Sequence, residues 1–144
     1  MYLEKSKIDD LEIFYMMSQQ KHIGKHLNTK SLKEFQNEFK ENNTIFLSVM
    51  SDENIVGYII LVFETQAVQL KRIVIDEKYL GLGFKALVLL DNYCQKIINK
   101  NKLWLDVYAD NKRAISLYEK SGYSRYSEGV ENYREVWFYK KIFI

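Results

Sequence analysis

The 144-residue sequence lacks proline altogether and contains a single cysteine, Cys94. Without proline, nothing in the chain forbids long regular helices and strands. A single cysteine allows no disulfide bond within the chain, which fits a reducing compartment. The apolar runs are too short to span a bilayer as a helix, and no signal peptide opens the sequence. We therefore expect a cytoplasmic protein with no membrane partner.

A strong charge of one sign is also absent. The 21 lysine and arginine residues nearly balance the 19 aspartate and glutamate residues, and the net charge is +2. This balance argues against a dedicated nucleic-acid-binding protein, which would usually be clearly basic. Hydrophobic residues make up 47% of the chain, which is enough for a packed core. The length suits one domain over residues 1–144.

Two glycines mark the most informative stretch, residues 72–87. A β-branched run ends near Ile75, a charged turn follows, and Gly81-x-Gly83 leads directly into a helical pattern. Glycine lets the backbone approach an anion without a side chain in the way. The free N–H groups and the dipole at a helix start then hold negative charge. The pattern predicts a phosphate-binding loop between a strand and a helix.

A second block supports this interpretation. Residues 103–123 read as a strand followed by Asn-x-x-Ala, then Leu-Tyr, then a glycine that ends a helix. Together the two blocks resemble the GNAT superfamily of acetyl-CoA-dependent N-acetyltransferases over about residues 55–123. The resemblance implies a single GNAT-like domain of α/β (α+β) class. Its mixed, mostly antiparallel central sheet would have about seven strands, flanked by about four helices.

Hydrophobic and turn patterns give the expected elements. They predict helices over residues 9–19, 31–42, 84–99 and 111–120, and strands over residues 1–5, 44–50, 54–63, 66–75, 102–108, 123–126 and 133–142. Ser31 and Glu34 form a capping-box pattern at the start of the second helix. Residues 20–30 are polar and are expected to form a loop. Gly129 is expected near the tip of a final hairpin.

The resemblance implies acetyl-CoA as the cosubstrate, with no metal. It places the cofactor against the strand residues Ile73, Val74 and Ile75, the loop residues Leu80, Gly81, Leu82, Gly83, Phe84 and Lys85, and the helix residues Asn111, Ala114, Leu117 and Tyr118. The strand would pair with the pantetheine arm through its backbone. Family members usually carry Arg or Gln where Leu80 stands and a small residue where Lys85 stands. The Lys85 ammonium is therefore either a phosphate ligand or a solvated side chain.

The resemblance also implies catalytic roles. The family tyrosine that matches Tyr118 acts as the general acid and gives a proton to the departing thiolate of CoA. The attacking amine must first lose a proton, because the pKa of an alkyl ammonium is about 10.4. Family members often carry a glutamate on the strand that matches residues 66–75, and this strand has none. The nearest carboxylates are Glu64 and Asp106; a water chain or an amine of low pKa would also serve.

Other reactive side chains fit structural roles better. Cys94 shares a helical face with Leu87 and Leu90, so we expect it in the core rather than acting as a nucleophile. His22 and His26 have i, i+4 spacing, but no further ligand lies near them in the sequence to complete a metal site. We interpret them as surface histidines. The resemblance implies that their loop helps line the acceptor pocket, so either histidine could touch the substrate.

We therefore expect an N-acetyltransferase that moves an acetyl group from acetyl-CoA to a primary amine. The acceptor would be a small molecule or a protein N-terminus, attacking directly in a ternary complex. The sequence does not identify the acceptor or the oligomeric state, and a homodimer stays open. Two alternatives also stay open: a non-catalytic acetyl-CoA-binding regulatory protein, and a toxin that acetylates aminoacyl-tRNA. The retained Tyr118 argues against the first, and the small net charge argues against the second.

Overall fold

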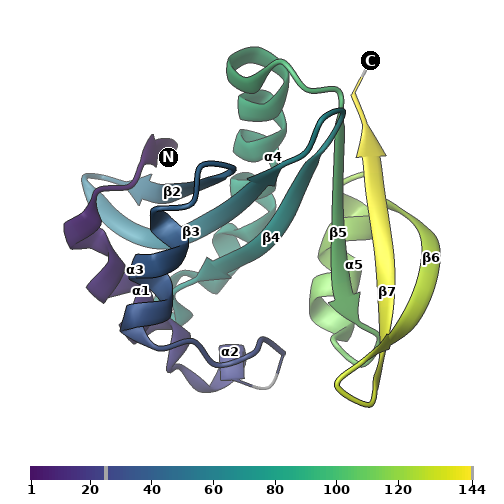
Figure 1. The fold of residues 1–144 in the computed structure, drawn as a ribbon, viewed down its shortest axis with the longest axis horizontal. Coiled ribbons are helices and arrows are strands. Elements are labelled where there is room, and N and C mark those ends of the chain that lie inside the picture. Colours follow the sequence, from purple (N-terminus) through teal and green to yellow (C-terminus); the bar gives the residue numbers. More distant parts are fainter. Residues whose placement is uncertain (25, 144) are drawn as a thin grey trace.

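A computed structural model describes residues 1–24 and 26–143, which form a seven-stranded sheet with helices on both faces (Figure 1). The strands are β1 (Tyr2–Lys5), β2 (Thr44–Ser51), β3 (Asn54–Phe63), β4 (Val68–Ile75), β5 (Lys102–Tyr108), β6 (Ser124–Glu131) and β7 (Arg134–Ile142). The helices are α1 (Leu11–Ser18), α2 (Lys21–Gly24), α3 (Leu32–Phe39), α4 (Gly83–Tyr93) and α5 (Lys112–Lys120). Short 3₁₀ turns lie at Ile8–Asp10 and Glu77–Leu82, and a π-helical turn at Cys94–Ile98 extends α4. None of the described helices has both the length and the apolar character needed to cross a bilayer.

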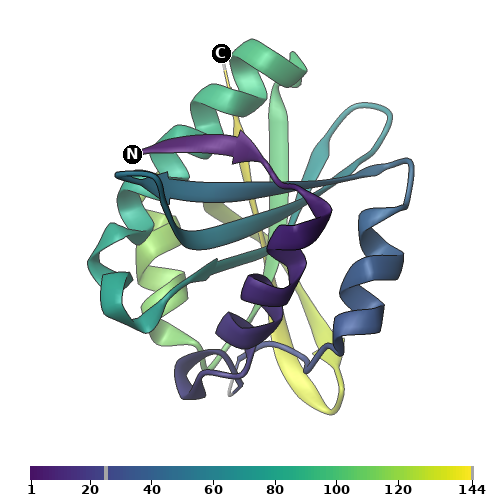
Figure 2. The ribbon, with the colours of Figure 1, turned by 90° about the vertical axis from the view of Figure 1, so that its left-hand side faces the viewer.

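The sheet is mostly antiparallel. Its strands run in the order β1-β2-β3-β4-β5-β7-β6, and only the β4–β5 pair is parallel. Helices α4 and α5 cover one face, and α1 and α3 cover the other (Figure 2). This arrangement confirms the predicted fold class, with five α-helices where about four were expected.

Each face of the sheet has its own apolar core. Leu87 and Leu90 of α4 are fully buried in the cluster beneath α4 and α5. On the opposite face, Phe14 of α1 stacks on Tyr58 of β3 with ring centroids 4.6 Å apart, and Phe35 of α3 meets the same ring edge-on at 5.8 Å. The two helical layers are therefore anchored independently to the central strands.

The capping box at the start of α3 is confirmed. The Glu34 N–H donates to Ser31 Oγ over 3.1 Å, and the Ser31 N–H donates to Glu34 Oε1 over 3.2 Å. These two bonds satisfy backbone donors that have no partner within the helix. They fix the point at which the chain turns from the polar segment into α3.

Residues 20–30 differ from the predicted loop, because they contain the one-turn helix α2. The Gln20 carbonyl accepts hydrogen bonds from the N–H groups of Ile23 and Gly24. Ile23 is 7% exposed and belongs to the α1–α3 core. The prediction was wrong here because a single buried side chain, which gives no periodic signal, holds this turn in place.

The final hairpin also turns elsewhere than predicted. Gly129 lies inside β6, opposite Val136, and the turn falls at Asn132 and Tyr133. These two residues have φ values of +53° and +61°. Two successive left-handed residues match the twist of a tight hairpin, and asparagine tolerates this conformation better than most residues.

The parallel pair β4–β5 is joined over a short length only. Val68 pairs with Leu103 and Gln69 with Trp104, and the strands then separate, as Figure 1 shows. A β-bulge in β4 accompanies the separation. Ile60 of β3 faces Arg72 while the next residue, Leu61, faces Leu70, so Lys71 is the extra residue. The sheet therefore opens along one edge of β4.

The register shows which backbone groups of β4 face this opening. The Asp76 N–H donates to the Val56 carbonyl of β3 over 2.9 Å. Backbone groups alternate in direction along a strand, so those of Val74 also face β3. Those of Ile73 and Ile75 therefore point away from β3, toward the side from which β5 has withdrawn.

Gly57 of β3 sets how closely the end of β4 can approach. A Cβ atom at Gly57 would lie 2.4 Å from the Val74 carbonyl oxygen and 2.8 Å from Ile75 Cδ1. Because the first of these atoms is backbone, the strands would have to move apart. Gly57 thus contributes to the shape of the edge at which the sheet opens.

We predict that Gly57→Ala lowers the free energy of unfolding by about 1–3 kcal/mol, the usual cost of overpacking a core. Urea denaturation would measure the change. Gly129→Ala in β6 is the matched control, because its Cβ would meet Phe138 and Val136 at ordinary distances of 3.6 and 3.9 Å. An equal loss of stability in the two variants would contradict the steric argument.

Candidate active site

The opening between β4 and β5 forms a cleft of about 450 Å³. Side chains from four parts of the chain line it: the segment from α2 to α3, strand β4, strand β5, and the start of α5 with the β6–β7 hairpin. Of the residues predicted from sequence, the cleft brings together Ile73, Asn111, Ala114 and Tyr118. Segments far apart in the chain therefore meet at the place where sheet pairing fails.

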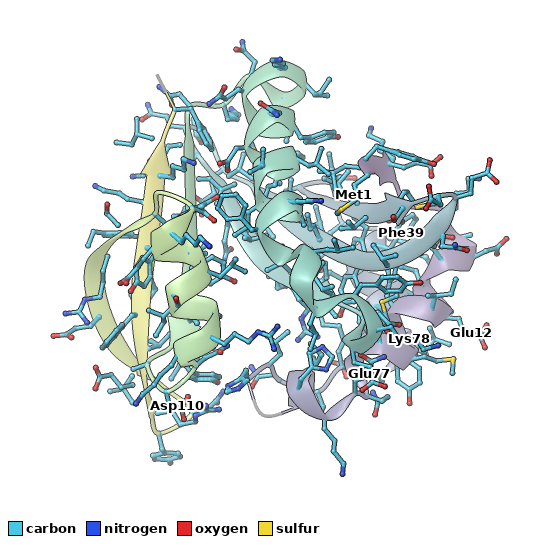
Figure 3. The ribbon with its side chains drawn as sticks, turned by 180° about the vertical axis from the view of Figure 1, so that it is seen from behind. Met1, Glu12, Phe39, Glu77, Lys78 and Asp110 are labelled. Carbon is cyan, nitrogen blue, oxygen red and sulfur yellow. The ribbon has the colours of Figure 1, made fainter. Side chains whose placement is uncertain are left out.

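The two helices beyond the cleft begin at the same end of the molecule. In Figure 3, Asp110 lies just before α5, and Glu77 and Lys78 lie in the turn that leads to α4. This is also the end at which β4 and β5 have separated (Figure 1). The positive ends of two helix dipoles therefore lie near the open end of the sheet.

The glycine block lies in the turn before α4. Gly81 is exposed, and a Cβ built on it would have no atom within 4 Å. Gly83 is buried at the start of α4, and its Cβ would meet Leu117 Cδ2 at 3.1 Å. The two glycines thus have different roles: Gly81 leaves open space, whereas Gly83 lets α4 pack against α5.

The neighbouring predicted residues surround this turn. Leu80 and Leu82 pack against the core beneath α4, and Leu117 packs there from α5. Phe84 is 40% exposed, and the Lys120 ammonium lies 5.6 Å from its ring centroid. Lys85 is exposed on the first turn of α4. None of these side chains lines the cleft between the strands, so a contact with a cofactor would be made at the turn itself.

Asn111 begins α5 as its cap. Its Oδ1 accepts a hydrogen bond from the Ala114 N–H over 3.3 Å. Ala114 and Tyr118 are one turn apart on the face of α5 that meets the cleft. Because the Ala114 side chain is small, it leaves space in the cleft beside the Tyr118 ring.

Tyr118 is 8% exposed, and its ring meets Tyr123 edge-on at a centroid distance of 6.0 Å. Burial raises the pKa of the Tyr118 phenol, and the negative charge of Asp106 raises it further. The hydroxyl is therefore protonated at neutral pH and able to donate.

Asp106 of β5 is the carboxylate whose charge acts on the Tyr118 phenol. Asp106 stays partly open to solvent. Desolvation by the cleft wall raises the pKa of its carboxyl, and the charge of Glu131 at the end of β6 raises it further. Both carboxylates line the cleft. A carboxylate with a raised pKa is a better proton acceptor than an ordinary aspartate at neutral pH.

Glu64 lies elsewhere. It does not line the cleft, and its Oε1 accepts a hydrogen bond from the Trp104 indole N–H over 2.9 Å. This contact is at the joined end of β4 and β5, where Gln69 pairs with Trp104. The structure therefore does not bring Glu64 to Tyr118, and Asp106 is the better placed of the two carboxylates.

The predicted strand residues are divided between backbone and side-chain roles. Val74 and Ile75 are buried in opposite cores, and only Ile73 lines the cleft with its side chain. The Ile75 carbonyl, which faces the opening, forms a hydrogen bond of 2.9 Å with Nε2 of His22. His22 must carry its proton on Nε2 in this contact.

The two histidines were expected at the surface, in a loop from which either could touch the substrate. His22 and His26 both line the cleft and are only partly exposed. Within the described part of the chain, no three His, Cys, Asp or Glu side chains group to hold a metal ion.

Cys94 is 1% exposed, as predicted, and burial raises the pKa of its thiol to about 12.

Asn28 connects the two walls of the cleft. Its carbonyl accepts a hydrogen bond from Arg72 Nη2 of β4 over 2.7 Å. Its side-chain Oδ1 accepts from the Tyr108 hydroxyl over 3.5 Å and from Asn132 Nδ2 over 3.3 Å. The segment before α3 is therefore tied to β4, to β5 and to the hairpin turn.

A charge cluster around the buried Glu38 carboxylate lies beside the same segment. The Lys30 ammonium contacts Glu38 Oε1, and Lys71 Nζ lies 2.5 Å from Glu38 Oε2. Burial alone would raise the pKa of Glu38, but the two ammonium groups outweigh it and hold that pKa below its usual range. Burial lowers the pKa of Lys30. Sequence reasoning missed this cluster, because its members are far apart in the chain and follow no motif.

Comparison with known proteins is consistent with this geometry. A chimera of the spermidine N-acetyltransferase SpeG from Vibrio cholerae and hSSAT is 18% identical, with a TM-score of 0.83, and the match covers 99% of this chain and 96% of that chain. The aminoglycoside acetyltransferase AAC(6')-Ib in complex with coenzyme A is 18% identical, with a TM-score of 0.84, and the match covers 98% and 94%. These similarities show a shared fold.

No curated protein matches the chain. The model of the acetyltransferase (GNAT) family, however, matches residues 9–123, which is most of its length. The chain therefore belongs to the acetyltransferase (GNAT) family.

Proposed function

We propose that the cleft between β4 and β5 carries out acetyl transfer from acetyl-CoA to a primary amine. The observation that carries this proposal is the meeting of Tyr118 and Asp106 at the open edge of β4. The solved structures with this fold include a spermidine N-acetyltransferase in complex with CoA and spermine, and an aminoglycoside acetyltransferase. The printed names of these two proteins thus point to amine acceptors.

The residues present fit acetyl-CoA. The backbone groups of Ile73 and Ile75 face the opening, so an extended pantetheine arm could pair with them as an added strand. The open space at Gly81 and the start of α4 suit the phosphates. The Ile75 carbonyl is already bonded to His22, so the arm would use the remaining backbone groups or displace that ring.

The proposed reaction balances through two side chains of this chain. Asp106 takes a proton from the ammonium, and the freed amine nitrogen bonds to the acetyl carbon. As the carbon–sulfur bond breaks, Tyr118 gives its proton to the thiolate. The buried phenolate that remains is costly, and protonated Asp106 can return a proton to it. One amine proton thus ends on the thiol of CoA. The second proton, which the nitrogen must lose to become an amide, passes to water as the carbon–sulfur bond breaks.

Release of free CoA thiol from acetyl-CoA, measured across a panel of primary amines, tests the proposed function. Amine-dependent release supports an enzyme. Binding of acetyl-CoA without release for any amine would favour the regulatory alternative, and release that requires aminoacyl-tRNA would favour the toxin. Neither alternative has a specific observation in its favour here.

We predict that CoA stabilises the protein through the turn before α4. Ligand at about 100 times its dissociation constant should add about 2.7 kcal/mol to the free energy of unfolding. Gly81→Val should fold normally, because no atom lies within 4 Å of the added Cβ, yet it should reduce the thermal shift. Gly24→Val, also in open space, is the matched control. No shift of the wild-type protein at millimolar CoA would overturn the proposed cofactor site.

For Tyr118 we predict a catalytic rather than a packing role. Tyr118→Phe keeps the ring against Tyr123 and removes only the hydroxyl, so the melting temperature should change little. A general acid typically contributes about 10²–10⁴-fold, so kcat should fall at least about tenfold. Tyr123→Phe removes the matched hydroxyl outside the cleft, one that donates to Asp91 over 3.1 Å. An equal or greater loss of kcat in Tyr123→Phe would rule against the assignment.

Asp106 gives a prediction in which stability and activity move in opposite directions. A carboxyl whose pKa is higher in the folded state favours folding when protonated, so its ionised form costs stability at neutral pH. Because solvent reaches Asp106 and screens its charge, Asp106→Asn should raise the melting temperature only slightly at pH 7. The two proteins should converge at about pH 3, below the ordinary aspartate pKa of about 3.9.

The same variant should lower kcat/KM at pH 7 and remove the loss of activity that the wild type shows as Asp106 becomes protonated. Glu64→Gln is the matched comparison, because Glu64 lies outside the cleft. A larger loss of kcat/KM in Glu64→Gln than in Asp106→Asn would return the role of base to Glu64.

A further inference from the structure

The walls of the cleft carry charges of opposite sign. Asp106 and Glu131 stand on the wall formed by β5 and the end of β6, close enough for one carboxylate to raise the pKa of the other. Tyr118 also lines the cleft, and the negative charge of Asp106 raises the pKa of its phenol. An ammonium group that enters the cleft is therefore attracted to this wall, where the proposed chemistry takes place.

The opposite wall keeps a positive charge. Lys30, Lys71 and Arg72 line it. Lys30 and Lys71 share the single carboxylate of Glu38, and no carboxylate is paired with Arg72 in the described structure. Glu34 also lines this wall, so three cations face two carboxylates. The Arg72 guanidinium lies within hydrogen-bonding reach of the Tyr58 hydroxyl, and its Nη1 is shut off from solvent.

Both walls begin where the pairing of β4 with β5 ends. Lys71, the extra residue of the β-bulge, and Asp106 both stand just beyond Gln69 and Trp104, the last pair that joins β4 to β5. The Lys71 side chain is 44% exposed, so a ligand can reach it. His22 and His26 also line the cleft, and they add no negative charge to either wall.

We infer that the acceptor is a primary amine that also carries an anionic group, a carboxylate or a phosphate, and is not a polyamine. This inference rests on the proposed function. The amine lies toward Asp106 and Glu131, and the anionic group toward Lys71 and Arg72. A polyamine would bring a second ammonium against the positive wall, where it meets like charge.

Matched acceptors test this inference. In the first pair, β-alanine carries a carboxylate and its amide does not. In the second pair, phosphoethanolamine carries a phosphate and ethanolamine does not. Spermidine represents the polyamines. In the wild type, kcat/KM should be at least about tenfold higher for the anionic member of one pair, and spermidine should be the poorer acceptor. The pair that shows the larger difference in kcat/KM identifies the anionic group of the acceptor as a carboxylate or a phosphate. The preference should weaken as salt rises.

Variants of Lys71 locate the effect. Lys71→Gln should reduce the preference about two- to fivefold, the range expected for an exposed charged partner, and Lys71→Glu should reduce it further. Lys33→Glu is the matched control, because Lys33 is exposed on the same side of the molecule, on α3, and does not line the cleft. It should leave the preference unchanged.

Two outcomes overturn the inference: kcat/KM values that are equal within both pairs, or a higher value for spermidine than for every anionic amine. If no amine is turned over, the same pairs are added to the CoA complex, and the anionic member must give the larger thermal shift. Equal shifts contradict the inference. Failure of the proposed function is distinct, because it would appear as no CoA shift and no thiol release with any acceptor.

Discussion

The failure of hydrogen bonding between β4 and β5 is the constraint on which the rest of the structure depends. Two neighbouring parallel strands would normally satisfy each other, yet these pair only at Val68–Leu103 and Gln69–Trp104. Unpaired backbone donors and acceptors at a sheet edge are costly unless something covers them. The edge of β4 is consequently where we propose that a ligand pairs, with one carbonyl already satisfied by His22 and the cleft beside it.

The chemistry proposed for the cleft depends on two groups, of which Asp106 affects the protonation of Tyr118. Burial keeps Tyr118 protonated but also makes its proton harder to release. The charge of Asp106 adds to that difficulty until Asp106 itself takes up a proton. Deprotonation of the amine and protonation of the thiolate are thereby linked, because the first makes the second easier.

The sequence predicted the elements of the fold where the pattern was local. The strand runs, the Ser31–Glu34 capping box and the Asn111 cap each depend on residues within a few positions of one another. It missed α2 and the turn at Asn132, since one buried side chain and one left-handed pair leave little periodic signal. The charge cluster around Glu38 could not be predicted, because only tertiary packing brings its members together.

Amide hydrogen exchange of β4 tests the central claim most directly. The Ile73 and Ile75 amides face the opening, whereas the Val74 amide faces β3 and serves as an internal control. If the pantetheine arm of CoA pairs with this edge, saturating CoA should slow exchange at Ile73 or Ile75 and leave Val74 almost unchanged. Equal exchange rates with and without CoA at both outward-facing amides would contradict the account.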